Sequence, residues 1–235
     1  MNKLSMINNE SITLCSAIKL VRLSVEEKKN ISPKLQYIIT NLDYKDNHNR
    51  EDIRIELEKI LFSDNVREIF LKLNDLNILK VFSPHFYRCF DFNQHNKYHD
   101  KDVFEHIVSV IKNVPKKKDL RLAAFLHDIG KPFCFTLDEN KVGHFRGHEV
   151  VSSIIANKIL SSLGYEKEFI QNVVSLIRYH MIKFKYLNQD DIKNLVNNLG
   201  EEFFKDLLLL KIADNLSKNP KYIEIDNLLY IYESI

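Results

Sequence analysis

Glycine and proline are scarce in this sequence, with five of each among 235 residues. Folds built from many short strands need both residues at their turns, so the scarcity argues against such folds and favours helices. No apolar run approaches the roughly 18 residues that a membrane-spanning helix requires, and the run of leucines at residues 207–210 is far too short. The first residues also lack the apolar stretch and cleavage site of a secretion signal. We therefore expect no membrane segment.

Cysteine is also rare. Cys15, Cys89 and Cys134 are odd in number and show no C-x-x-C spacing, which argues against a disulfide framework or a zinc knuckle. They are interpreted as reduced thiols of a cytoplasmic protein. The net charge of +2 gives no overall attraction to nucleic acid or membranes. With 45% hydrophobic and 28% charged residues, the composition is that of a globular protein with one or two domains.

What the sequence does contain is helical periodicity along most of its length. In the first part, Ile53, Leu57, Ile60 and Leu61 fall on one face of a helix that follows a polar turn at residues 41–50. Proline at position 84 breaks the pattern, and an irregular aromatic stretch follows over residues 86–98. We predict a helical neck-like or body-like segment over residues 1–90 and a second domain over residues 91–235.

The second domain is predicted to be a bundle of helices. Asp102 precedes a periodic apolar run and is a candidate N-cap. Further helices are expected over residues 119–127, 149–163, 169–184, 190–199, 201–216 and 227–235. Residues 133–137 and 141–145 are strand candidates, so the fold class is all-α with at most a small β-hairpin near 133–145.

Adjacent His127 and Asp128 stand out because one backbone segment supplies both a nitrogen and an oxygen ligand. Gly130 is expected to permit a tight turn just after them. Other histidines and acids occur at intervals on predicted helices, and a helical bundle can bring such groups together in its core. The candidate metal ligands are His106, His127, Asp128, His148, His180 and Asp214.

Imidazole and carboxylate without thiolate suit Mn, Fe, Ni, Co, Zn or Mg. One divalent ion would take His106, His127, Asp128 and Asp214, and would activate water for attack on phosphorus. His148 and His180 would hold a second ion with Asp128 bridging, or would bind phosphate directly.

Four other residues are candidates for catalysis or substrate binding. Lys131 either places its charge on a substrate phosphate, a role shared between catalysis and binding, or is a solvated lysine at a helix end. His144 is a candidate general acid, with a plain hairpin residue as the alternative. Arg146 and Arg178 each lie two residues before a proposed ligand, where they contact phosphate or form exposed salt bridges.

Three stretches of the second domain carry a resemblance to a known family: residues 102–114 (DVFEHIVSVIKNV), 122–132 (LAAFLHDIGKP) and 143–160 (GHFRGHEVVSSIIANKIL). They resemble the HD phosphohydrolase superfamily, and in particular the HD domain of bacterial CCA-adding tRNA nucleotidyltransferases. Residues 51–86 look like the neck and body of that family, and residues 17–35 resemble the end of its catalytic head. The resemblance runs from about residue 12 to about residue 222.

The sequence departs from that family in one respect. No closely spaced glycine pair and no Asp-x-Asp occurs in the N-terminal segment, so we expect no CCA addition by this chain. What the resemblance then implies is metal-dependent phosphodiesterase or phosphatase activity on a nucleotide or an RNA-end phosphate ester, such as a 2′,3′-cyclic phosphate.

A binding module is the alternative function, because the neck-like segment is more than a minimal hydrolase needs. Such a headless nucleotidyltransferase-like protein would bind RNA or a separate catalytic subunit. A basic cluster around residues 112–121 favours RNA contact, although a solvated loop explains it equally. The complete ligand set favours the enzyme, and the sequence leaves the oligomeric state open.

Overall fold

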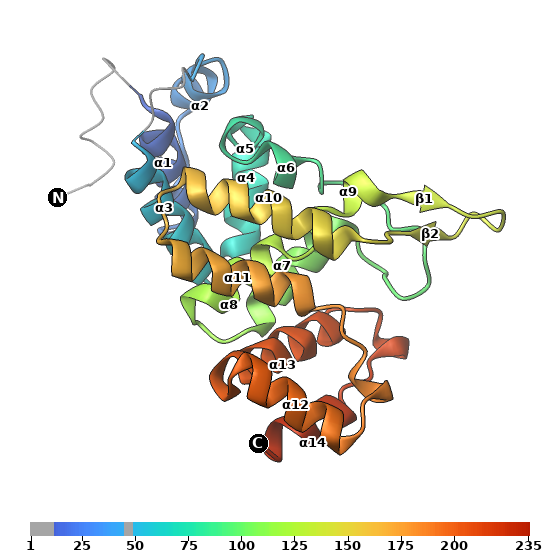
Figure 1. Ribbon diagram of the computed structural model, residues 1–235. Coiled ribbons are helices and arrows are strands. Elements are labelled where there is room, and N and C mark those ends of the chain that lie inside the picture. The colour runs from blue at the N-terminus through green and yellow to red at the C-terminus, as the bar shows by residue number, and fades with distance from the viewer. Residues whose placement is uncertain (1–11, 45–48) are drawn as a thin grey trace. The chain divides into compact units, whose positions relative to one another are not determined.

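The computed structural model describes residues 12–44 and 49–235. The first residues of the predicted neck-like segment and part of the expected turn at residues 41–50 therefore lie outside the described residues. The chain divides into two compact units. The first contains the described residues up to Tyr87 together with Ser162–Gly164, and the second contains Arg88–Ser161 and Tyr165–Ile235. Figure 1 follows the elements by colour from the N-terminus to the C-terminus.

The first unit is helical. Its elements are α1 (Leu14–Glu26), α2 (Pro33–Thr40), α3 (Arg50–Phe62), α4 (Val66–Asp75), α5 (Ile78–Phe82) and α6 (Pro84–Tyr87). The predicted apolar face of α3 is buried, and α1 packs against α3, α4 and α5. Within this core Arg22 donates to Glu56 at 2.8 Å. Since both side chains are buried, the pair neutralises charges that would otherwise be costly.

The second unit is a helical bundle with one small hairpin. Its elements are α7 (Val103–Asn113), α8 (Lys118–Leu126), α9 (Lys131–Cys134), β1 (Thr136–Leu137), β2 (Gly143–His144), α10 (His148–Ser162), α11 (Lys167–Tyr179), η2 (Phe184–Tyr186), α12 (Gln189–Leu199), α13 (Glu201–Leu216), η3 (Pro220–Tyr222) and α14 (Asp226–Glu233). Helices α7, α8, α11 and α13 pack on one another and form its core. The all-α prediction is confirmed.

Helix α7 begins as predicted. The side chain of Asp102 accepts a hydrogen bond of 2.7 Å from the backbone N–H of Glu105, which satisfies one of the free donors at the helix start. The helix is strongly amphipathic, and this cap fixes where its buried face starts. Along residues 12–44 and 49–235, the structure contains no helix with the length and apolar character to cross a membrane.

The helix expected over residues 169–184 is shorter than predicted at its end. Helix α11 stops at Tyr179, and the N–H of Ile182 donates to the Tyr179 carbonyl at 3.0 Å in a tighter turn. The carbonyl of His180 is instead bound by Lys211 Nζ at 2.7 Å. The helix therefore ends where Lys211, far away in the sequence, binds the His180 carbonyl. The apolar periodicity of the sequence continues past this point, which is why the predicted helix was too long.

The predicted hairpin is present but smaller, and its first strand begins only at Thr136. Thr136 pairs with His144 and Leu137 with Gly143 in antiparallel register. Phe133, expected in the strand, belongs to α9, where its N–H donates to the Gly130 carbonyl at 3.0 Å. The turn after the His-Asp pair thus continues as one helical turn before the strand begins.

Candidate metal centre

Asp128 lies at the centre of the second unit, with its two carboxylate oxygens facing different histidines. Its Oδ2 atom is 3.2 Å from His106 Nε2 and 3.2 Å from His127 Nε2. His106 comes from α7, whereas His127 and Asp128 follow the last residue of α8. The end of α8 therefore brings two side chains to the helix that packs beside it.

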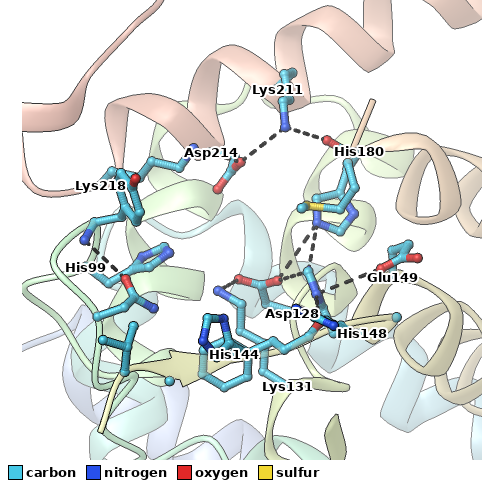
Figure 2. A pocket seen from close by; sticks show the side chains of 18 residues that line it. His99, Asp128, Lys131, His144, His148, Glu149, His180, Lys211, Asp214 and Lys218 are labelled. Atoms are coloured by element: carbon cyan, nitrogen blue, oxygen red, sulfur yellow. Dashed lines mark hydrogen bonds and ion pairs between the residues drawn. The ribbon is translucent and has the colours of Figure 1, made fainter. Parts of the chain in front are cut away.

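The other oxygen of Asp128 faces a second pair of histidines. Oδ1 is 3.1 Å from His148 Nε2 and 3.9 Å from His180 Nε2. His148 is the first residue of α10, and His180 follows the last residue of α11. Figure 2 shows Asp128 between these two imidazoles and Lys131. Two groups of three ligand atoms result, and Asp128 is common to both.

Backbone carbonyls fix the orientation of three of the four rings. The Nδ1 atoms of His127, His148 and His180 lie 2.8, 2.7 and 2.6 Å from the carbonyls three residues before them. A carbonyl only accepts, so each Nδ1 carries the proton and donates. Each neutral ring then presents an unprotonated Nε2 to the centre, which is the tautomer that a metal ligand needs.

These atoms fit a cation better than they fit one another. His148 Nε2 and His180 Nε2 are 3.3 Å apart, and neither carries a proton in the neutral tautomer. The buried Asp128 Oδ1 between them has no hydrogen-bond donor. Three buried acceptors facing each other without a donor is a costly arrangement. A divalent ion among them would relieve this cost, and the donor set suits one.

The pKa shifts favour an ionised carboxylate at Asp128 and a neutral imidazole at His180. Burial alone would raise the pKa of Asp128, but His127, Lys131 and His106 lower it well below its ordinary value. Burial, with a smaller effect from the neighbouring His127, lowers the pKa of His180 well below its ordinary value. Burial by itself would lower the pKa of His106. Hydrogen bonds to Asp128 and Asp214 outweigh burial, so the pKa of His106 is raised above its ordinary value. The centre is thus prepared to hold positive charge.

Asp214 on α13 contacts the cluster through His106. Its Oδ1 is 3.2 Å from His106 Nε2, and its Oδ2 is 3.9 Å from Lys211 and 3.8 Å from Lys218. Burial would raise the pKa of this carboxyl, but His106 and the two lysines lower it well below its ordinary value. All six predicted ligands are buried in one place, and they come from five segments of the chain.

Lys131 is buried rather than solvated, which excludes the solvated lysine considered above. Its Nζ is 2.7 Å from Asp128 Oδ2 and donates to Gln94 Oε1 at 2.7 Å, and the residue is 5% exposed. It lines a cavity of about 410 Å³ beside Asp128, together with His148 and His180. That volume is in the range of small-molecule sites.

Of the three other predicted site residues, two line this cavity and one does not. His144 lies on β2 and lines this cavity, and its Nε2 is 2.9 Å from Asp138 Oδ2. Arg146 is exposed and also lines the cavity. Arg178 lies on an exposed position of α11 and is not among the residues that line this cavity. The roles of all three remain predictions.

Gly130 serves a different purpose from the one expected. Its φ of −81° is an ordinary helical value, so the left-handed freedom of glycine is not used. A Cβ atom there would lie 2.7 Å from Ser152 N and 2.8 Å from the His148 carbonyl. Glycine thus lets the turn after Asp128 lie directly against α10, the helix that begins with His148.

Sequence reasoning missed several residues of the site. His99 lines the cavity, and its ring centroid is 4.8 Å from that of His106. Burial, with smaller effects from Lys131 and His106, lowers the pKa of His99 to about 2. His99 lies in an irregular loop, where helical periodicity gives no signal. Lys211 and Lys218 lie three residues before and four after Asp214, a spacing that places them on its face and could have indicated them.

Comparison with known proteins agrees with this geometry. The family model described as "HD domain" matches residues 94–219, which include all six predicted ligands. The chain is 28% identical to the A-adding tRNA nucleotidyltransferase of Deinococcus radiodurans, over 77% of this chain and 43% of that protein. It is also 28% identical to the CC-adding tRNA nucleotidyltransferase of Thermus thermophilus, over 79% of this chain and 44% of that protein. The predicted resemblance is confirmed.

A different group of relatives was not expected. The chain is 27% identical to a bifunctional uridylyltransferase/uridylyl-removing enzyme of Ruegeria pomeroyi, over 82% of this chain and 23% of that protein. The chain spans less than half the length of each of these relatives.

Proposed function

This chain belongs to the HD-domain family, and from that premise we propose that it is a metal-dependent phosphohydrolase whose substrate is a phosphate ester of a nucleotide or of an RNA end. The observation that carries the proposal is the arrangement around Asp128. One carboxylate faces two pairs of imidazoles, and three of those four rings are held by backbone carbonyls with Nε2 directed inward.

The residues divide into two sets of ligands. His106, His127, Asp128 and Asp214 would hold one divalent ion, and Asp128, His148 and His180 would hold a second. Bound there, such an ion supplies Lewis acidity toward water and toward a phosphoryl oxygen. In the alternative arrangement His148 and His180 contact the phosphate directly.

Lys131 would hold substrate charge in this site. It is buried beside Asp128 and lines the cavity, so its ammonium group is placed near any phosphate that reaches the carboxylate. In a buried site with little competing water, that attraction is stronger than at the surface. Arg146 at the cavity wall would add a second positive charge, and Arg178 would act only on a part of the substrate outside this cavity.

His144 is the proposed general acid. During hydrolysis a water oxygen bonds to phosphorus, the bond from phosphorus to the leaving oxygen breaks, and that oxygen takes up a proton. His144 lines the cavity, and Asp138 at 2.9 Å orients its ring. A histidine in the cavity wall has the chemistry to deliver the proton.

The relatives support a substrate that contains a nucleotide. Two are named for tRNA and one for the removal of uridylyl groups. A phosphodiester, including a 2′,3′-cyclic phosphate at an RNA end, has the charge and size that the cavity accommodates. A phosphomonoester is the other candidate within the same class.

A metal-resolved activity screen tests the proposal. Purified protein, stripped with a chelator, is supplied with Mg, Mn, Fe, Co, Ni or Zn and assayed against bis(p-nitrophenyl) phosphate, 2′,3′-cyclic nucleotides and mononucleotides. We expect hydrolysis that requires added metal and ceases with chelator. Absence of turnover with every metal and substrate, despite bound metal, would contradict the enzyme and favour the binding-module alternative.

A further inference from the structure

A second cavity opens beside the metal centre and has no part in the mechanism above. It has a volume of about 620 Å³ and lies between η2, α13 and the segment from η3 to α14. Tyr98, Met181, Lys211 and Lys218 line both this cavity and the one beside Asp128. Figure 2 shows Lys211 and Lys218 on either side of Asp214 in the first cavity. A ligand at Asp128 that extended past these lysines would reach the second cavity.

Aromatic rings line this second cavity. The ring centroids of Tyr98 and Tyr222 are 5.0 Å apart in an edge-to-face pair, and Lys97 Nζ lies 5.4 Å from the centroid of Tyr98. Tyr186 on η2 is 71% exposed, and Tyr98 is 49% exposed. Large apolar side chains that remain this exposed around one opening are typical of ligand-binding surfaces. Flat rings with accessible faces are suited to stacking on nucleobases.

The charge of the cavity wall favours an anion. Four lysines line it, against the two acids Glu224 and Asp226. The lysines are Lys183, Lys185, Lys211 and Lys218. Positive charge interleaved with aromatic rings is the pattern by which proteins bind single-stranded nucleic acid.

The walls of the cavity are held in place by the fold. Phe184, in the middle of Lys183–Tyr186, is 3% exposed and packs against Phe204, so it fixes the short helix whose flanking residues face the cavity. Tyr98, another residue of the lining, accepts a hydrogen bond of 3.0 Å at its carbonyl from the N–H of Asn219. A site with such anchored walls loses little entropy when it binds a ligand.

We propose that this second cavity binds the base and adjoining phosphate of the nucleotide next to the scissile ester, so that the preferred substrate is a single-stranded oligonucleotide. The inference rests on the proposed function, because it takes the scissile phosphate to lie at Asp128. The aromatic wall stacks on the base, Lys183 and Lys185 hold the outer phosphate, and Lys211 and Lys218 hold the phosphate between the two cavities.

Binding without turnover tests this inference. A 5′-fluorescein tetraribonucleotide and an abasic tetramer with the same backbone are titrated with the full chain in a chelator, and fluorescence anisotropy gives each Kd. We expect the abasic probe to bind more weakly. Tyr186→Ala should weaken tetranucleotide binding roughly tenfold, since stacking is lost. Lys183→Gln should weaken both probes and reduce the salt dependence of binding, because one phosphate contact is removed.

Tyr37→Ala is the matched control, since Tyr37 is 72% exposed on α2 and lines neither cavity. We expect it to bind as the wild type does. Equal affinity for the two probes, or a Tyr186→Ala Kd within twofold of wild type, would overturn the inference. Hydrolysis of bis(p-nitrophenyl) phosphate, measured in parallel with metal, separates the two claims. Its absence counts against the proposed function, whereas the binding data decide the second cavity.

Discussion

Asp128 has two carboxylate oxygens, and each faces a different pair of imidazoles. One approaches His106 and His127 at 3.2 Å, and the other approaches His148 at 3.1 Å. The pair formed by His148 and His180 can serve either of two roles. If His148 and His180 hold an ion, they act on the charge that develops at the leaving oxygen. If they contact phosphate, they act on substrate affinity.

Replacing His148 or His180 with alanine separates these roles. We expect each variant to lose one divalent ion per chain by elemental analysis and to keep the other, because His106, His127, Asp128 and Asp214 remain. Hydrolysis should fall roughly 10²–10³-fold, the usual loss when one stabiliser of transition-state charge is removed. His85→Ala on α6 is the control and should retain full metal content. Unchanged stoichiometry with a raised KM would instead assign these histidines to phosphate.

The sequence predicted which six His and Asp side chains gather at the centre, because these residues recur in order on or beside predicted helices. It could not predict the tautomers, since these depend on where each ring meets a backbone carbonyl. It also missed His99, whose position is set by an irregular loop that folds back on His106. The role of Lys131 stays a prediction, and only the folded chain shows that its side chain is buried against Gln94 and Asp128.

At the scale of elements, the contact between the turn after Asp128 and α10 decides the distance between the two halves of the centre. Gly130 meets the backbone of Ser152 and His148, and its N–H donates to Ser152 Oγ at 2.9 Å. Any side chain at this position would push α10 away, and His148 would move with it.

Gly130→Ala should therefore impair both stability and metal binding. The added methyl group clashes with backbone atoms that cannot rotate away, so we expect a loss of about 1–3 kcal/mol in the free energy of unfolding. Gly164→Ala is the comparison. Its φ of +73° makes alanine strained there, but nothing lies within 4 Å of the added atom. Urea unfolding should show both variants destabilised, whereas metal titration should show weakened binding for Gly130→Ala alone. Equal metal affinity in the two variants would contradict this role for Gly130.

The start of α7 could be predicted from the sequence, whereas the end of α11 could not. The start of α7 depends on a local signal, the side chain of Asp102. The end of α11 depends on Lys211, which is 31 residues from His180 in sequence and binds its carbonyl. The first strand was predicted too long for a similar reason, because α9 includes the first two residues of the predicted strand at 133–137.

At the scale of the whole molecule, the second unit buries many ionisable groups in its core. Without a bound ion their protonation governs stability. His99 and His180 have lowered pKa values in the folded chain, so below about pH 6.5 the unfolded chain binds protons that the folded chain does not. His106 has a raised pKa, and its contribution is already fully present below that pH.

The stability of the metal-free protein should consequently fall as the pH drops below about 6.5, by about 1 kcal/mol per pH unit for each of these two histidines. His99→Leu should remove one of the two contributions and reduce the slope. Urea unfolding in a chelator between about pH 7 and 5 measures both slopes. An identical slope in the variant would show that His99 does not stay neutral in the folded chain.

The most direct test of the central claim combines metal content and turnover in one variant, Asp128→Asn. The amide keeps the size of the side chain but removes the charge that faces both pairs of histidines. For the wild type we predict bound divalent metal by elemental analysis and metal-dependent hydrolysis of a phosphodiester. For the variant, at an unchanged helical content by circular dichroism, we predict loss of metal and at least a 10²-fold loss of turnover, roughly the cost of removing a key electrostatic group. Full metal content together with wild-type turnover in Asp128→Asn would contradict the account.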